Sequence, residues 1–197
     1  MDIADKIKLK YPLSIARCYE IAGLQSNSVL RVQRLIDLFE ETVRYLALVG
    51  LASYTHYGLQ DALVEKQRQG LNKPSLGHWL NLLQSLVKAL EPVDPNFLTP
   101  PFNHGHKNDS IAEVTPILCS FTGVQAPKNI KLIHFLDAVV EFRNKKIGHG
   151  TLSSGEAKKV KGPLQAALSV WLDGLACLAE RQLIYVSRVT YDAPRFL

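Results

Sequence analysis

Residues 128–150 read KNIKLIHFLDAVVEFRNKKIGHG, and this stretch indicates the kind of fold to expect. Leu132, Leu136 and Val139 recur at intervals of four and three residues. Such spacing places apolar side chains on one side of an α-helix, the side that packs against a core. The stretch therefore predicts a helix that is buried along one side.

The end of this stretch breaks the apolar pattern. Arg143 comes four residues after Val139 and falls on the same side of the helix, where an apolar residue is expected. Departures of this kind concentrate at functional sites. Gly148 and Gly150 favour the end of the helix, which leaves His149 in the turn between them.

Helical periodicity continues on both sides of this stretch, from residue 12 to about residue 181. The predicted fold class is all-α, a helical bundle. Ser75, and the run from Ser153 to Glu156, are expected to cap two of its helices. Helices are expected at residues 12–22, 28–54, 59–69, 75–90 and 110–120, the last interrupted near Pro116, and a long final helix follows Ser153.

The C-terminal segment differs in composition from the helical part. Residues 182–191 are rich in β-branched and aromatic side chains, which predicts one short β-strand. Because no convincing second strand precedes it, its partner strand is expected in another chain or in further C-terminal sequence. The predicted organisation is a helical domain at 1–181, followed by a strand and tail at 182–197 that lead into a further C-terminal region.

The overall composition excludes several classes of protein. The chain has 197 residues, of which 47% are hydrophobic and 21% charged, as in globular domains. Its most apolar stretch, residues 45–54, is about half as long as the roughly 20 residues of a membrane span. The N-terminus lacks the apolar run of a secretion signal. These features predict a cytoplasmic protein that does not cross a membrane.

Neither a disulfide framework nor a metal site is expected. The chain has three cysteines, an odd number, and they lie far apart in the sequence. His104 and His106 lie in a proline-rich loop, but two histidines without nearby cysteine or carboxylate ligands make a poor metal site. We expect thiols, no metal and no cofactor.

The positive charge of the chain is concentrated in one segment. Residues 143–161 hold six basic residues and one acidic residue, whereas the rest of the chain holds seventeen of each. Concentrated Lys and Arg are typical of proteins that bind a phosphate backbone, although a solvated helix end has a similar composition. The lysines predicted to contact RNA are Lys145, Lys146, Lys158, Lys159 and Lys161.

Arg143, Asn144 and His149 together have the chemistry needed to cleave RNA. A histidine with a pKa near neutral can transfer a proton to or from a ribose hydroxyl or a leaving oxygen. An arginine stabilises the additional negative charge that develops on the phosphorus centre. Asn144 could orient the histidine or a phosphate oxygen. Since the nucleophile is the 2′-hydroxyl of the substrate itself, this scheme requires no metal.

The octapeptide Arg143–Gly150 resembles the signature of the HEPN superfamily, in which an arginine, a polar residue that is often asparagine, and a histidine a few residues further on recur together. The segments LFEETVRYL at 38–46 and PSLGHW at 74–79 also resemble HEPN-like regions of larger bacterial proteins. The resemblance in motif depends mainly on the octapeptide.

This resemblance implies a helical bundle that dimerises, so that two copies of the motif face one cleft. It also implies metal-independent endoribonuclease activity of the kind found in prokaryotic toxins and antiviral effectors, with Arg143, Asn144 and His149 as the catalytic residues. Some HEPN members have lost catalysis and act as dimerisation or ligand-sensing modules. The expected partners are RNA, a second copy of the chain, and a cognate regulator or further domains.

A simpler interpretation of the same residues remains open. The octapeptide could merely end a helix, with Arg143 paired to a carboxylate such as Glu40 or Glu41. In the ribonuclease interpretation the same two glutamates would support Arg143. The sequence thus leaves three hypotheses: an endoribonuclease acting as a homodimer, a non-catalytic HEPN-like module, and a helical interaction domain with no role in nucleic-acid binding.

Overall fold

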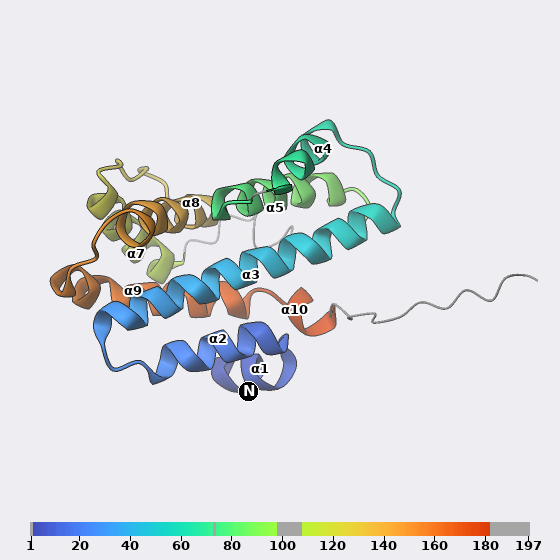
Figure 1. The fold of residues 1–197 in the computed structure, drawn as a ribbon. Coiled ribbons are helices and arrows are strands. Elements are labelled where there is room, and N and C mark those ends of the chain that lie inside the picture. Colours follow the sequence, from blue (N-terminus) through green and yellow to red (C-terminus); the bar gives the residue numbers. More distant parts are fainter. Residues whose placement is uncertain (1, 73, 98–107, 182–197) are drawn as a thin grey trace, which may run out of the picture.

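The structure, a computed structural model, describes residues 2–72, 74–97 and 108–181. Every regular element within these ranges is a helix, so the predicted all-α bundle is confirmed (Figure 1). The strand predicted at 182–191 and the tail that follows it lie outside the described residues.

The longest helix, α3 (Ser28–His56), runs through the middle of the bundle (Figure 1). It begins where the Asn27 side chain accepts two backbone N–H groups of the first turn, which satisfies donors that have no partner within the helix. Its buried side packs against α2 (Leu13–Leu24), α5 (Leu76–Leu90) and α9 (Ser154–Asp173). Helix α3 is therefore the scaffold from which side chains reach most other parts of the bundle.

Two helices complete the bundle at the end where α3 begins. Helix α7 (Asp109–Thr122) packs against α9 and against α8 (Leu132–Phe142), and α8 also contacts α5. Leu132, Leu136 and Val139 of α8 are buried, as their spacing predicted. This packing fixes the direction in which the C-terminus of α8 points.

The interruption predicted near Pro116 is wrong, because α7 continues through it from Asp109 to Thr122. Proline removes one backbone hydrogen bond and costs a helix interior about 3 kcal/mol. Buried residues on both sides of Pro116, among them Ile111 and Leu118, hold the helix against α8 and α9. Tertiary packing thus outweighs the local preference.

Other helices are short, and one of them was not predicted. Helix α1 (Ile3–Lys10) has only Ile7 buried and is held by Lys6, which donates to the Asp173 carbonyl at 2.7 Å and to its carboxylate at 2.9 Å. Four of its eight residues are charged, so its apolar side is short. The remaining short elements are α4 (Ala62–Gln69), η1 (Gly70–Asn72), η2 (Arg143–Gly148) and α10 (Cys177–Glu180).

The two predicted helix caps are confirmed. Ser75 caps α5 together with His78, whose Nδ1 accepts the Ser75 N–H at 3.1 Å. Ser153 caps α9 together with Glu156, whose carboxylate accepts the Ser153 N–H at 2.9 Å. Both caps set where the chain enters a helix, and the second lies just beyond the predicted site.

Two further properties of the described residues bear on function. None of their helices combines the length and the apolar character that a membrane crossing requires. Cys18, Cys119 and Cys177 are all free thiols, and burial raises the pKa of Cys177 to about 12. A thiol with such a high pKa is a poor nucleophile at neutral pH.

Candidate functional site

The predicted motif forms a widened helical turn at the end of α8. Residues Arg143–Gly148 continue the helix as a π-helix, η2. The His149 N–H donates to the carbonyl of Asn144, five residues earlier, at 3.1 Å, whereas an α-helix uses the carbonyl four residues earlier. Such π-helical turns are rare in proteins, and those that occur are often found at functional sites.

The wider turn determines which residue lies beside the Arg143 guanidinium. In an α-helix the neighbour one turn on is four residues away, which would place Ile147 there. Here Gly148 takes that position, and a Cβ on it would lie 3.5 Å from Arg143 Nη1. Because glycine has no side chain, the guanidinium is not covered from this direction. The side chain of Arg143 is 32% exposed.

Arg143 is held by two neighbours. Its Nε lies 3.7 Å from Oε2 of Glu40 on α3, and its Nη1 donates to Oδ1 of Asn144 at 3.3 Å. The Glu40 side chain is only 16% exposed and also pairs with Arg44, one turn further along α3. These contacts use part of the guanidinium, and its other N–H groups have no partner in the part of the chain that the structure describes.

The structure separates the two glutamates proposed as partners of Arg143. Glu40 contacts Arg143, whereas Glu41 makes no ion pair with it among the described residues. Glu41 instead faces α2, where its negative charge adds to burial in raising the pKa of Cys18. Adjacent positions on a helix point about 100° apart, so only one of the two can face α8.

His149 lies at the exposed end of the motif. No hydrogen bond or ion pair of its imidazole is found within the described ranges, and none joins it to Arg143. Its backbone is fixed on both sides, by the bond to Asn144 and by Gly150, at which a Cβ would lie 2.0 Å from the Lys145 carbonyl oxygen. Only glycine fits at position 150, so the turn holds a solvent-facing histidine on a constrained backbone.

Lys145 and Lys146 make contacts that fix this turn to its surroundings. Lys145 Nζ lies 2.9 Å from Glu141 and donates at 2.9 Å to the Thr122 carbonyl at the end of α7. Lys146 Nζ lies 2.7 Å from Glu156, and this pairing, with hydrogen bonds from Ser153, lowers the pKa of Glu156 to about 2. These two lysines are thus paired with carboxylates in the described structure.

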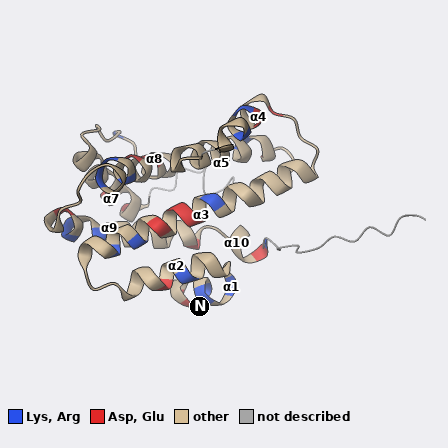
Figure 2. Ribbon diagram, viewed as in Figure 1, with Lys and Arg blue, Asp and Glu red and all other residues tan. Residues whose placement is uncertain are grey.

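The remaining three lysines of the basic segment have no carboxylate partner within the described residues. Lys158 and Lys159 are exposed and Lys161 is half-buried on the first turns of α9. In Figure 2 the basic residues of α8–η2 and of early α9 lie at the same end of the bundle. The unpaired positive charge of this end therefore comes from α9 more than from η2.

A groove that sequence reasoning missed adjoins the motif. It has a volume of about 320 Å³ and includes Cys119 and Thr122 of α7 and His134, Asp137 and Glu141 of α8 in its lining. Burial raises the pKa of Asp137, while a hydrogen bond from Gln84 and the charge of His134 lower it. His134, Asp137 and Glu141 recur at intervals of three and four residues, and this spacing could have predicted from the sequence that they share one polar face of α8.

The described residues contain no group of three His, Cys, Asp or Glu side chains placed to hold a metal ion. His104 and His106 lie outside the described residues. His134, which had no assigned role, has a structural one, because its Nδ1 accepts the Lys131 N–H at 3.1 Å and caps α8.

Comparison of the chain with protein-family models, with curated proteins and with solved structures finds no match. Functional inference therefore depends on the residues and their geometry.

Proposed function

We propose that this chain is a metal-independent endoribonuclease of the toxin or antiviral-effector type, acting as a homodimer through Arg143, Asn144 and His149. The observation that supports this most is the π-helical turn. It places Gly148, rather than a side chain, against the Arg143 guanidinium and leaves His149 exposed on a constrained backbone.

The reaction we assign to these groups is transfer of a phosphodiester to the neighbouring ribose hydroxyl. The 2′-oxygen bonds to phosphorus while a neutral histidine removes its proton, the bond from phosphorus to the 5′-oxygen breaks, and a protonated histidine donates a proton to that oxygen. The product ends are a 2′,3′-cyclic phosphate and a 5′-hydroxyl. Arg143 stabilises the charge that develops on the non-bridging oxygens, and Asn144 holds the guanidinium in position.

Dimerisation follows from the number of proton-transfer groups that this reaction needs. One copy supplies one histidine at the motif, whereas the reaction requires an acid and a base. A symmetric dimer would bring His149 of the partner subunit to the same phosphate and supply both. Light scattering of the purified chain should give twice the mass of one chain.

We assign contacts with the RNA backbone mainly to Lys158, Lys159 and Lys161, which have no carboxylate partner in the described structure. Lys145 and Lys146 would have to leave Glu141 and Glu156 to bind a phosphate. Their main role in this proposal is to hold the turn that carries Arg143 and His149.

The proposal is tested by incubating the purified chain with RNA in EDTA. RNA should be cleaved to cyclic-phosphate ends, and RNA methylated at each 2′-oxygen should stay intact because it lacks the nucleophile. His149→Ala should abolish cleavage, whereas His56→Ala, which removes another exposed histidine that makes no hydrogen bond among the described residues, should not. Equal activity in the two variants would refute the proposal.

One observation favours the second candidate, a non-catalytic HEPN-like dimerisation or ligand-sensing module. Arg143 already contacts Glu40 and Asn144, so part of its capacity to bind a phosphate is used. A dimer that binds RNA no better than an unrelated helical protein and leaves it uncut would support this candidate.

A further inference from the structure

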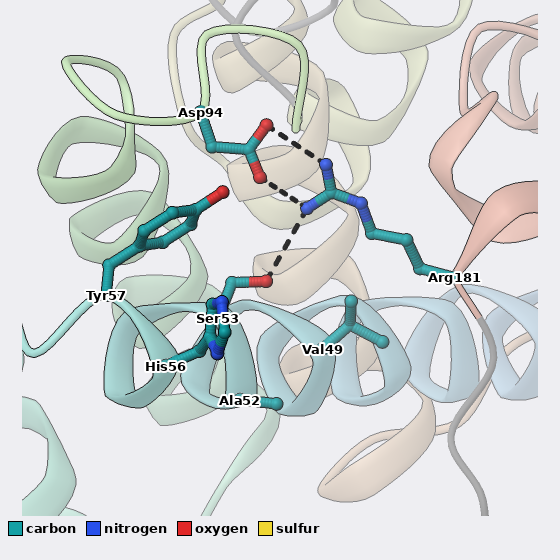
Figure 3. A pocket seen from close by; sticks show the side chains of 7 residues that line it. All are labelled: Val49, Ala52, Ser53, His56, Tyr57, Asp94 and Arg181. Atoms are coloured by element: carbon teal, nitrogen blue, oxygen red, sulfur yellow. Dashed lines mark hydrogen bonds and ion pairs between the residues drawn. The ribbon is translucent and has the colours of Figure 1, made fainter.

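A second polar site lies at the C-terminal end of α3, away from the motif. Its cavity has a volume of about 370 Å³, within the roughly 300–1,000 Å³ range of small-molecule sites. Figure 3 shows its lining, which comes from three segments far apart in the sequence: α3 and the residue after it, the loop after α5, and the residue after α10. The lining residues are Val49, Ala52, Ser53, His56, Tyr57, Asp94 and Arg181.

An ion pair forms one wall of this cavity. Arg181 donates from Nη1 and Nη2 to the two carboxylate oxygens of Asp94, at 2.5 and 3.0 Å, and its guanidinium lies 5.1 Å from the centre of the Phe97 ring. The side chain of Asp94 is 10% exposed and that of Arg181 31%. Hydrogen bonding to Asp94 raises the pKa of Arg181, so the guanidinium stays charged. The wall is therefore polar and without net charge.

Two hydroxyl groups face this wall and have no acceptor among the described residues. The Tyr57 hydroxyl points across the cavity toward Asp94 (Figure 3), yet it makes no hydrogen bond within the described residues. The Ser53 hydroxyl oxygen accepts from Arg181 at 3.5 Å, which leaves its own proton to donate. His56 packs edge-on against Tyr57 with ring centres 5.2 Å apart, and these two rings form an aromatic rim.

The charges of the wall exclude some ligands and favour others. A carboxylate placed between Tyr57 and Asp94 would be repelled by the Asp94 charge, and for an ammonium group the repulsion of Arg181 would offset the attraction of Asp94. A charged group would also lose its hydration without gaining an oppositely charged partner, because Asp94 and Arg181 already neutralise each other. An uncharged group that both donates and accepts hydrogen bonds meets neither penalty.

We propose that this cavity binds a small uncharged molecule that carries an amide group on a planar body. The amide N–H donates to a lone pair of Asp94 that Arg181 does not use, and the amide oxygen accepts from the hydroxyl of Tyr57 or Ser53. The planar body lies against the rings of His56 and Tyr57. Asp94 and Arg181 thereby select against charged analogues of the same shape.

This site is independent of the proposed ribonuclease motif. Ser53 lies thirteen residues beyond Glu40 on α3, roughly 20 Å along the helix axis. None of the residues assigned to RNA cleavage lines the cavity. A negative result in the RNA assays therefore leaves this proposal intact. Likewise, failure to bind a ligand in this cavity leaves the ribonuclease proposal intact.

A matched pair of probes tests the proposal, nicotinamide and nicotinate, which have the same ring and differ in one charged group. In ¹H–¹⁵N NMR titrations of the full chain, nicotinamide should shift the backbone signals of Ser53, Tyr57 and Asp94 saturably. Nicotinate should bind at least about tenfold more weakly, because it has no donor for Asp94 and carries a like charge. Equal binding of the two probes, or no saturable shift with nicotinamide, would overturn the proposal.

Two variants locate the binding in this cavity. Tyr57→Phe removes one unpaired hydroxyl and should weaken nicotinamide binding roughly fivefold, the usual effect of one neutral hydrogen bond. Tyr19→Phe, a half-buried tyrosine of α2 without a hydrogen bond among the described residues, is the control and should leave binding unchanged. Asp94→Asn should reduce the preference for nicotinamide over nicotinate. Unchanged affinity in both Tyr57→Phe and Ser53→Ala would also overturn the proposal.

Discussion

The π-helical turn at the end of α8 and the cavity at the end of α3 are both built on ion pairs, but of different kinds. At the turn, Lys145 pairs with a carboxylate four residues away and Lys146 with one ten residues away, and only Arg143 reaches a distant carboxylate, Glu40, at the longer distance of 3.7 Å. At the cavity, Asp94 and Arg181 are 87 residues apart, and the Asp94 side chain is only 10% exposed. The two lysine pairs shape a local turn, whereas the Asp94–Arg181 pair joins the loop after α5 to the residue after α10.

The largest expected effect concerns catalysis at the turn. His149→Ala should reduce RNA cleavage by roughly 10²- to 10⁴-fold, the usual contribution of a proton-transfer group. Its unfolding temperature should stay close to that of the parent chain, because the imidazole is exposed and makes no hydrogen bond in the described structure. Gel-based cleavage assays and thermal unfolding of the same preparations separate the two effects.

Removing one partner from each kind of ion pair tests the structural comparison directly. Asp94→Ala should lower the free energy of unfolding by about 2–3 kcal/mol, because it removes a largely buried carboxylate and leaves the half-buried Arg181 unpaired. Glu141→Ala should lower it by less than about 1 kcal/mol, since Glu141 and Lys145 are 39% and 50% exposed. Urea unfolding measures both, and equal losses would show that depth does not distinguish the two pairs.

Most of the fold could be predicted from the sequence because its signals are local. Apolar spacing located the long helices, and Ser75 and Ser153 marked two helix starts. The π-helical turn was not predictable in this way, because it requires Gly150 to pack against the Lys145 carbonyl. Glu40 could be proposed only together with Glu41, since the rotation of α3 relative to α8 is set by packing along the whole interface.

The cavity at the end of α3 had no comparable signal. Asp94 and Arg181 each lie beside a helix end, and neither belongs to a motif. Their proximity results from the way α10 and the loop after α5 meet α3, which depends on contacts such as that of Gly50 with Phe97. Long-range pairs of this type are visible only after the fold is known.

The backbone of the turn can be tested with a pair of glycines. Gly150→Ala places a Cβ 2.0 Å from a carbonyl oxygen, so the turn must rearrange, and the expected loss of unfolding free energy is about 1–3 kcal/mol. Gly155→Ala is the control, because a Cβ there meets nothing within 4 Å and alanine favours the helix. RNA cleavage should fall in the first variant only. A Gly150→Ala protein of full stability and activity would mean that the turn tolerates a different backbone path.

The smallest expected effect is a pH dependence at the cap of α9. The pKa of Glu156 is lowered to about 2 by Lys146 first and then by Ser153, from an ordinary value of 4.5. A lowered pKa in the folded state means that the ionised carboxylate stabilises the fold above about pH 4.5 and loses this contribution as the pH falls toward 2. Glu156→Gln keeps a capping side chain at this position but removes the charge. Its unfolding temperature should be a few degrees below that of the parent at pH 7, and the two should converge between pH 4.5 and pH 2.

Glu20→Gln changes an exposed glutamate without a partner in the described structure, so it should follow the parent at every pH. A difference between parent and Glu156→Gln that stays constant from pH 7 to pH 3 would show that the Lys146–Glu156 charge pair does not hold the turn. The connection between η2 and α9 would then depend on the neutral hydrogen bonds of the cap alone.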